Sequence, residues 1–180
     1  MTDRYVILDR DGTINVDSDD FIKSPEEWLP LPGSLEAIAL LNSHGFKVVV
    51  ISNQSGVARG LFDFATLEAI HAKMKQMVKD AGGEIETIYF CPHGPDDACD
   101  CRKPKDGLFR RFAADYSDDL SQIYAVGDSF RDLQAAKSAG AKPILVKTGK
   151  GRNTLLKHPE LNLPIFENLY DAANFIVSQS

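Results

Sequence analysis

Short apolar runs recur along the chain and are separated by longer amphipathic stretches. Five of these runs are rich in Val, Ile and aromatic residues and are too short for helices, so they predict β-strands. The run FKVVVI is apolar almost throughout, which is typical of a parallel strand covered on both faces. The predicted strands cover residues 4–9, 46–51, 86–90, 122–126 and 143–146.

Between the strands, apolar residues recur at helical spacing. The helix opened by Ser34 as N-cap ends at Gly45, and a further strand and helix close the chain at 165–166 and 168–177. The other helices are predicted at 63–81, 106–116 and 132–139. In the longest of them the core face carries Leu67, Ile70, Met74, Met77 and Val78, and the solvated face carries Glu68, His71, Lys73, Lys75 and Lys79.

Strands that alternate with helices predict βαβ units. We therefore expect an α/β fold in which a doubly wound, Rossmann-like parallel sheet forms one domain over residues 1–180. Residues 14–30 show neither helical nor strand periodicity, so we expect a loop over the end of the first strand. The segment 148–151 (TGKG) lacks the full P-loop pattern and does not lead clearly into a helix, so we do not expect a P-loop.

Composition adds limits on partners and location. The 180 residues are 43% hydrophobic and carry a net charge of −6, which argues against a general nucleic-acid binder. No apolar stretch approaches the roughly 20 residues that span a bilayer, and the first strand leaves no room for a signal peptide. We expect a cytoplasmic protein without membrane or nucleic-acid partners.

The first predicted strand ends in two acids, Asp9 and Asp11, which point the same way from an extended backbone. Two carboxylates this close repel each other unless a cation lies between them, and Mg²⁺ is a hard cation that prefers oxygen ligands. One acid can then act as a nucleophile while the other carries a proton. A lone D-x-D is more often an acidic turn, so the pattern needs support from elsewhere.

That support comes from the ends of other predicted strands. Ser52 and Asn53 follow the second strand, Asp128 follows the fourth, and Lys103 follows a loop after the third. Because ligands bind beyond the carboxyl ends of strands in open α/β sheets, we expect these side chains to converge on one site.

The loop 91–101 has a separate chemistry. Cys91, His93, Cys99 and Cys101 follow the spacing C-x-H-x₅-C-x-C, which suits tetrahedral Zn²⁺ with three thiolates and one imidazole. Four protein ligands leave no open position, so this zinc is expected to be structural. The loop has few apolar residues, and the metal would order it.

Four segments resemble, in order, the motifs of the haloacid-dehalogenase-like phosphohydrolases: Asp9-x-Asp11-Gly-Thr13, the strand end at Ser52, Lys103, and the G-D-x-x-x-D pattern of Asp128. The resemblance implies an aspartyl-phosphate on Asp9, with Asp11 as general acid and base. It implies Mg²⁺ held by Asp9, Asp11 and Asp128, with Asp132 behind the ligands or at a helix start. The substrate-binding residues that we expect are Asp17, Ser18, Asp19, Asp20, Ser52, Asn53, Gln54, Ser55, Arg102, Lys103 and Ser129.

Within that superfamily the chain resembles most the heptose bisphosphate phosphatases, through residues 9–17, 53–60, 91–93 and 99–104. The resemblance implies removal of the 7-phosphate from a heptose 1,7-bisphosphate, a step toward nucleotide-activated heptose for lipopolysaccharide. No insertion is long enough for a cap domain, so we expect an open site. We also expect a monomer. The loop between His93 and Cys99 is short, as in histidinol-phosphate phosphatases, which keeps that substrate open as an alternative. Ser55 and the run 58–60 (ARG) favour the heptose enzymes.

Two other functions fit parts of the pattern. A non-catalytic zinc module would bind a partner through residues 91–101, but it would not need acids, a hydroxyl and a lysine at one sheet edge. A 3′-phosphatase acting on nucleic-acid ends is disfavoured by the acidic net charge.

Overall fold

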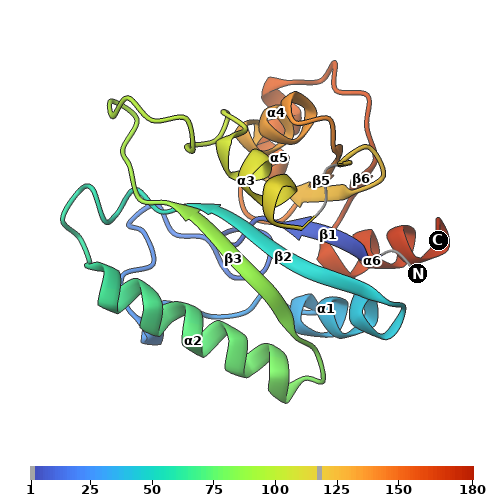
Figure 1. Ribbon diagram of the computed structural model, residues 1–180, viewed down its shortest axis with the longest axis horizontal. Helices are drawn as coiled ribbons and strands as arrows, with labels where there is room; N and C mark the ends of the chain where they lie inside the picture. The colour runs from blue at the N-terminus through green and yellow to red at the C-terminus, as the bar shows by residue number, and fades with distance from the viewer. Residues whose placement is uncertain (1–2, 117–118) are drawn as a thin grey trace.

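A parallel sheet flanked by helices forms the molecule. The computed structural model describes residues 3–116 and 119–180. Within them, a sheet of six strands has the order β3-β2-β1-β4-β5-β6, and every pairing is parallel (Figure 1). The strands are β1 (Arg4–Leu8), β2 (Phe46–Asn53), β3 (Ile85–Cys91), β4 (Tyr124–Gly127), β5 (Lys142–Val146) and β6 (Ile165–Phe166). The predicted α/β parallel sheet is confirmed.

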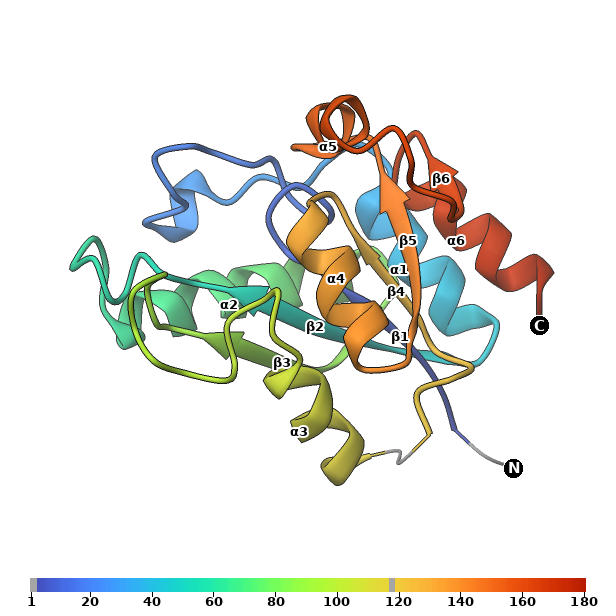
Figure 2. The same ribbon diagram turned by 90° about the horizontal axis from the view of Figure 1, so that it is seen from above.

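Helices cover both faces of this sheet. α1, α2 and α6 lie against one face, and α3 and α4 lie against the other (Figures 1 and 2). The helices are α1 (Ser34–Ser43), α2 (Phe64–Asp80), α3 (Gly107–Asp115), α4 (Phe130–Ser138), α5 (Gly151–Lys157) and α6 (Leu169–Ser178), with a 3₁₀ turn at Pro25–Glu27.

The two faces have separate apolar cores, and β1 contributes to both by simple alternation. Val6 and Leu8 pack into the cluster that includes α1 and α6, whereas Tyr5 and Ile7 pack into the cluster that includes α3. Alternate side chains of a strand point to opposite faces, so a strand buried on both sides must be apolar throughout. Each fully buried aliphatic side chain contributes about 1.5–3 kcal/mol, which fixes the position of the polar residues that follow the strand.

The chain reverses its direction of travel across the sheet at β1. β2 and β3 are added on one side of it, and β4 to β6 on the other. The loops that leave β1 and β4 therefore diverge, and such a switch point is where open α/β sheets bind ligands. Asp9 lies at this point, and its backbone N–H donates to the carbonyl oxygen of Val126 at 2.9 Å.

Two helix starts differ from the sequence prediction. α1 begins at Ser34 itself, and Gly33, with φ of 80°, takes the N-cap position, so the prediction of Ser34 as N-cap is wrong. α4 begins at Phe130 rather than at residue 132, because Ser129 and Asp132 form a capping box ahead of it.

α5 was not expected from the sequence. It begins at Gly151, the last residue of the run 148–151, so the expectation that this run does not lead into a helix is wrong. The Thr154 hydroxyl of α5 donates to the carbonyl oxygen of Asp128 at 2.9 Å. This short helix lacks an apolar stripe of its own, so tertiary contacts rather than periodicity stabilise it.

Two residues predicted on the solvated face of α2 point inward instead. His71 is 7% exposed. The Lys73 ammonium donates to the carbonyl oxygens of Pro25 and Trp28 at 2.6 and 2.7 Å, which ties the loop 14–30 to α2. The prediction was wrong here because helical periodicity cannot distinguish solvent from a polar loop that folds over the helix.

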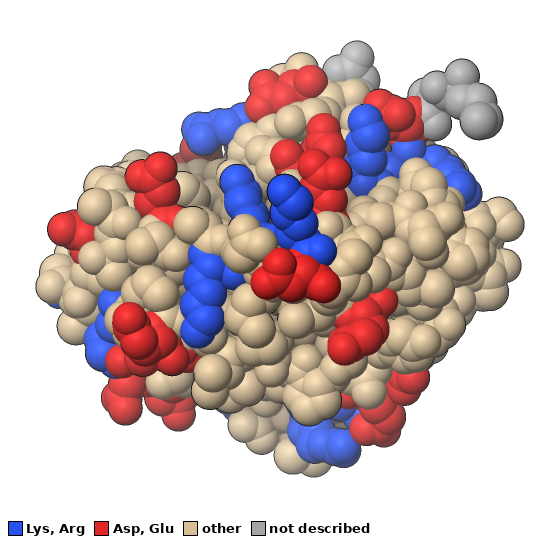
Figure 3. Space-filling model, turned by 90° about the horizontal axis from the view of Figure 1, so that it is seen from below, with Lys and Arg blue, Asp and Glu red and all other residues tan. Residues whose placement is uncertain are grey.

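On the molecular surface, acidic side chains lie between basic ones on the face shown in Figure 3. Within residues 3–116 and 119–180, none of the helices combines the length and the apolar character that a membrane crossing needs.

Candidate active site

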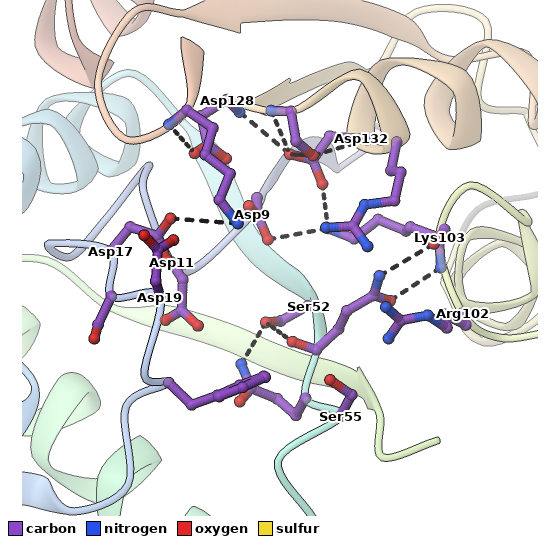
Figure 4. A pocket seen from close by; sticks show the side chains of 17 residues that line it. Asp9, Asp11, Asp17, Asp19, Ser52, Ser55, Arg102, Lys103, Asp128 and Asp132 are labelled. Atoms are coloured by element: carbon purple, nitrogen blue, oxygen red, sulfur yellow. Dashed lines mark hydrogen bonds and ion pairs between the residues drawn. The ribbon is translucent and has the colours of Figure 1, made fainter. Parts of the chain in front are cut away.

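Three carboxylates meet where the strands end. Asp9 follows β1, Asp128 follows β4, and Asp132 lies in the first turn of α4. Their ligand oxygens all lie within 4.8 Å of one another. Figure 4 shows the three acids gathered on one side of a pocket, with Ser52 and Ser55 on the opposite side.

Lys103 is the cation that balances part of this charge. Its ammonium lies 3.0 Å from Asp9 Oδ1 and 2.7 Å from Asp132 Oδ1, and it also donates to the carbonyl oxygen of Ile51 at 2.8 Å. The residue is only 3% exposed, so water screens these interactions little. The lysine is thus held between the ends of β1, β2 and α4.

The side chain of Asn53 fixes the backbone of this lysine. Asn53 Oδ1 accepts from the Lys103 N–H at 2.9 Å, and Asn53 Nδ2 donates to the Lys103 carbonyl oxygen at 3.1 Å. Both ends of the amide are used on one peptide segment, which anchors it to the end of β2.

The pKa values of the three acids are shifted in different directions: those of Asp9 and Asp128 are raised, and that of Asp132 is lowered. Burial, followed by the nearby Asp132, raises the pKa of Asp9 to about 7. Burial and the neighbouring acids Asp9 and Asp132 also raise the pKa of Asp128. Burial would raise the pKa of Asp132 too, but Lys103 overcomes this and holds it below its usual range. One ammonium therefore does not compensate three buried carboxylates, and the remaining negative charge suits a divalent cation.

The backbone around Asp128 is shaped to its carboxylate. A Cβ atom on Gly12 would lie 2.1 Å from Asp128 Oδ2, and one on Gly149 would lie 2.3 Å from the same oxygen. Both glycines have positive φ, 84° and 55°. Only glycine permits this approach, so the chain wraps closely around an oxygen of the acidic cluster. The Lys150 N–H also donates to this oxygen at 2.8 Å.

Asp11 is bound apart from the other acids. Its carboxylate accepts from Arg10 Nε at 2.8 Å, from Arg10 Nη2 at 3.2 Å and from Asn15 Nδ2 at 3.0 Å. Burial alone would raise the pKa of this carboxyl group, but the Arg10 guanidinium holds it below its usual range. Its side chain is not one of the three whose oxygens form the close group.

The loop after β3 brings together the four predicted zinc ligands. One ligand atom from each of Cys91, His93, Cys99 and Cys101 lies within 4.8 Å of the others. His93 Nδ1 lies 3.5 Å from Cys91 Sγ and 3.3 Å from Cys101 Sγ. Three thiols and an imidazole in this arrangement fit a structural Zn²⁺, as expected from their spacing.

Comparison with known proteins identifies the family. Residues 100–172 match the family model described as HAD-hyrolase-like. The chain is 51% identical to D-glycero-beta-D-manno-heptose-1,7-bisphosphate 7-phosphatase of Pseudomonas aeruginosa, over 98% of this chain and 99% of the relative. It is 58% identical to the enzyme of the same name from Bordetella bronchiseptica, over 84% and 85% of the two chains. The chain belongs to this family of phosphatases.

A crystal structure from the family agrees with the fold in detail. The D,D-heptose 1,7-bisphosphate phosphatase from B. bronchiseptica, complexed with magnesium and phosphate, aligns with a TM-score of 0.95 at 51% identity. The alignment covers 98% of this chain and 99% of that one. The predicted resemblance to haloacid-dehalogenase-like phosphatases is confirmed.

For this family member, the pocket gathers nearly all the site residues predicted from sequence. Asp20 does not line it. The predicted residues that do are Asp9, Asp11, Asp17, Ser18, Asp19, Ser52, Asn53, Gln54, Ser55, Arg102, Lys103, Asp128 and Ser129.

Three of the residues predicted to bind substrate form hydrogen bonds with other groups of the protein. Asn53 binds the Lys103 backbone, as described above. Gln54 accepts from Arg10 Nη2 at 3.2 Å and donates to Ser52 Oγ at 2.8 Å. The Ser129 hydroxyl donates to Asp132 Oδ2 at 2.9 Å. Their direct contact with substrate remains a prediction, and the structure gives each of them a positioning contact as well.

Sequence reasoning missed three residues that line the pocket: Phe21, Arg131 and Lys150. Arg131 stands inside the G-D-x-x-x-D motif, where a cation beside a predicted phosphate site was a usable signal. Phe21 has φ of 67°, which is rare for a bulky side chain, and the Arg59 guanidinium lies over its ring, 5.3 Å from the centroid. That contact joins the loop 14–30 to the loop after β2.

Proposed function

We propose that the chain is a Mg²⁺-dependent phosphatase that removes the 7-phosphate of D-glycero-β-D-manno-heptose 1,7-bisphosphate. The observation that carries the proposal is the convergence of Asp9, Lys103 and Asp128 at the switch point of the sheet, in a member of this family. The product would be a heptose 1-phosphate, a precursor of nucleotide-activated heptose for lipopolysaccharide.

In the proposed reaction, Asp9 attacks the phosphorus atom and forms an aspartyl-phosphate. Asp9 suits this role because its side chain, 12% exposed, is open to the pocket and is oriented by Lys103. The Lys103 ammonium and the hydroxyl of Ser52 bind phosphoryl oxygens and offset the charge that develops on them. Lys103 suits this role in particular, because three contacts already hold its ammonium in place at the pocket.

Asp9 and Asp128 are the side chains that would hold Mg²⁺, and Asp11 remains a predicted ligand. The metal would neutralise the approaching phosphate and act as a Lewis acid on its oxygens. Asp11 would protonate the leaving sugar oxygen and then accept a proton from the water that hydrolyses the aspartyl-phosphate.

Three cationic side chains that line the pocket suit a second phosphate. They are Arg102, Arg131 and Lys150. Burial and then the nearby guanidinium groups of Arg131 and Arg59 hold the pKa of Arg102 below its usual range. We propose that these cations bind the phosphate on C1, while Asp17 and Asp19 accept hydrogen bonds from sugar hydroxyls.

The test compares phosphate release from heptose 1,7-bisphosphate and from histidinol phosphate, with Mg²⁺ and after chelation. We expect a preference for the heptose substrate that is lost without Mg²⁺. A preference for histidinol phosphate would overturn the substrate assignment and retain the chemistry. Release of phosphate from neither compound would overturn the proposed function.

A further inference from the structure

Arg10 stands between the two catalytic aspartates in the sequence, yet the reaction above does not use it. Its side chain is fully buried, which is uncommon for a guanidinium group. A buried arginine requires acceptors for its five N–H groups. The structure supplies four such contacts, from the loop after β1, the loop after β2 and α2, and the two loops carry residues that line the active-site pocket.

Two of the contacts are to Asp11. Nε and Nη2 of Arg10 face Oδ1 and Oδ2 of that carboxylate at 2.8 and 3.2 Å, a fork-to-fork arrangement that fixes the plane of the carboxylate as well as its distance. Nη2 also donates to Gln54 Oε1 at 3.2 Å. Because the amide of Gln54 donates to Ser52 Oγ at 2.8 Å, the same guanidinium orients a predicted phosphate-binding hydroxyl.

The remaining contact is to His71 of α2. Arg10 Nη1 lies 3.1 Å from His71 Nε2. A guanidinium nitrogen can only donate, so Nε2 is the acceptor and the imidazole is neutral, with its proton on Nδ1. Burial and then the Arg10 charge lower the pKa of His71 to about 3, in agreement with that form. The ring is packed beside Phe90, with centroids 5.9 Å apart.

We propose that Arg10, held by His71, is a positioning residue that fixes the Asp11 carboxyl group for proton transfer to the leaving oxygen. The inference rests on the proposed phosphatase function. Because Arg10 favours the carboxylate form of Asp11, this residue first takes up a proton from solvent water. As the bond from Asp9 to phosphorus forms and the bond from phosphorus to the sugar oxygen breaks, that proton moves to the sugar oxygen. The carboxylate that remains is the form that the Arg10 fork binds.

A positioning role differs measurably from a structural one. The leaving group of p-nitrophenyl phosphate departs without a proton, whereas the C7 oxygen of a sugar phosphate requires one. kcat/KM reports all steps up to the first irreversible one, which is the loss of the leaving group. The ratio of kcat/KM for the sugar phosphate to kcat/KM for the aryl phosphate therefore isolates the proton transfer.

The experiment measures this ratio in His71→Phe, which removes the acceptor, and in His71→Gln, which retains one. Ile70→Val is the matched control, because Ile70 is a fully buried neighbour on α2 whose side chain has no polar atom that could accept from Arg10. We expect the ratio to fall about tenfold in His71→Phe, to recover at least partly in His71→Gln, and to stay unchanged in the control. Thermal unfolding verifies that each variant folds, and His71→Ala replaces His71→Phe if that variant does not.

The experiment distinguishes failure of the proposed function from failure of the inference about Arg10. A wild-type protein that hydrolyses neither phosphate would overturn the proposed function and this inference with it. An active wild-type protein with the same ratio in every folded His71 variant would overturn the inference alone. So would equal losses on both substrates, since they would show only a smaller fraction of active enzyme.

Discussion

The two candidate metal centres are built in opposite ways. The carboxylate centre takes Asp9, Asp128 and Asp132 from elements far apart in the sequence, and each is placed by the strand or helix that carries it. The thiolate centre takes all four ligands from the loop 91–101, which has little regular structure after the end of β3. The first centre is a product of the fold, whereas the second would create the local order itself.

Lys103 joins the two centres. It follows Cys101 by two residues, so the zinc loop delivers its backbone, but its ammonium ends between Asp9 and Asp132. Asn53 supplies a second anchor from β2. The comparison thus predicts that loss of Mg²⁺ leaves the site assembled, whereas loss of zinc disturbs it through Lys103.

The largest effect is expected from Asp9→Asn. An amide cannot attack phosphorus, so kcat should fall by at least about 10⁴-fold while the fold persists. Phosphate release and circular dichroism measure the two parts. Turnover near the wild-type level in a folded variant would contradict the assignment of Asp9.

Lys103→Met tests whether the carboxylate centre depends on its lysine. Breaking a buried ion pair leaves uncompensated charge, so the free energy of unfolding should fall by about 3 kcal/mol without metal, and activity should be almost lost. Lys47→Met is the control, since Lys47 pairs with Asp3 on the surface. Equal changes in stability in the two variants by denaturant titration would show that Lys103 is not the balancing charge.

Zinc removal tests the other side of the comparison. The protein as purified should carry about one zinc per chain, and a zinc chelator followed by restored Mg²⁺ should lower kcat by roughly 10- to 100-fold. Metal analysis and phosphate release measure this. Full activity in zinc-free protein would mean that Asn53 alone keeps Lys103 in place.

The smallest effect is expected from Asn53→Ala. With one of the two anchors removed, the Lys103 ammonium should be positioned less precisely against the phosphate. We therefore expect kcat to fall about tenfold while KM and the zinc content stay constant. Asn42→Ala is a matched control, because the Asn42 amide also bridges backbone groups, of Phe46 and Glu84, away from the pocket. A rise in KM without a fall in kcat would show instead that Asn53 binds substrate directly.

The sequence was sufficient for the parallel sheet because β-strands buried on both faces leave an unmistakable apolar pattern, as in residues 46–51. It was also sufficient to place Asp9, Lys103 and Asp128 at one edge, since the carboxyl ends of parallel strands share that edge. It was insufficient for α5, which tertiary contacts stabilise, and for His71, whose partner lies 61 residues away. Long-range polar contacts leave no periodic trace in a sequence.

The most direct test of the account is to find the phosphorylated residue. Acid quench during turnover, followed by borohydride reduction, converts a phosphorylated aspartate to homoserine, which mass spectrometry of the peptides locates. We predict homoserine at position 9, dependent on Mg²⁺ and absent when substrate is omitted. Homoserine at another position, or none during rapid turnover, would contradict covalent catalysis by Asp9.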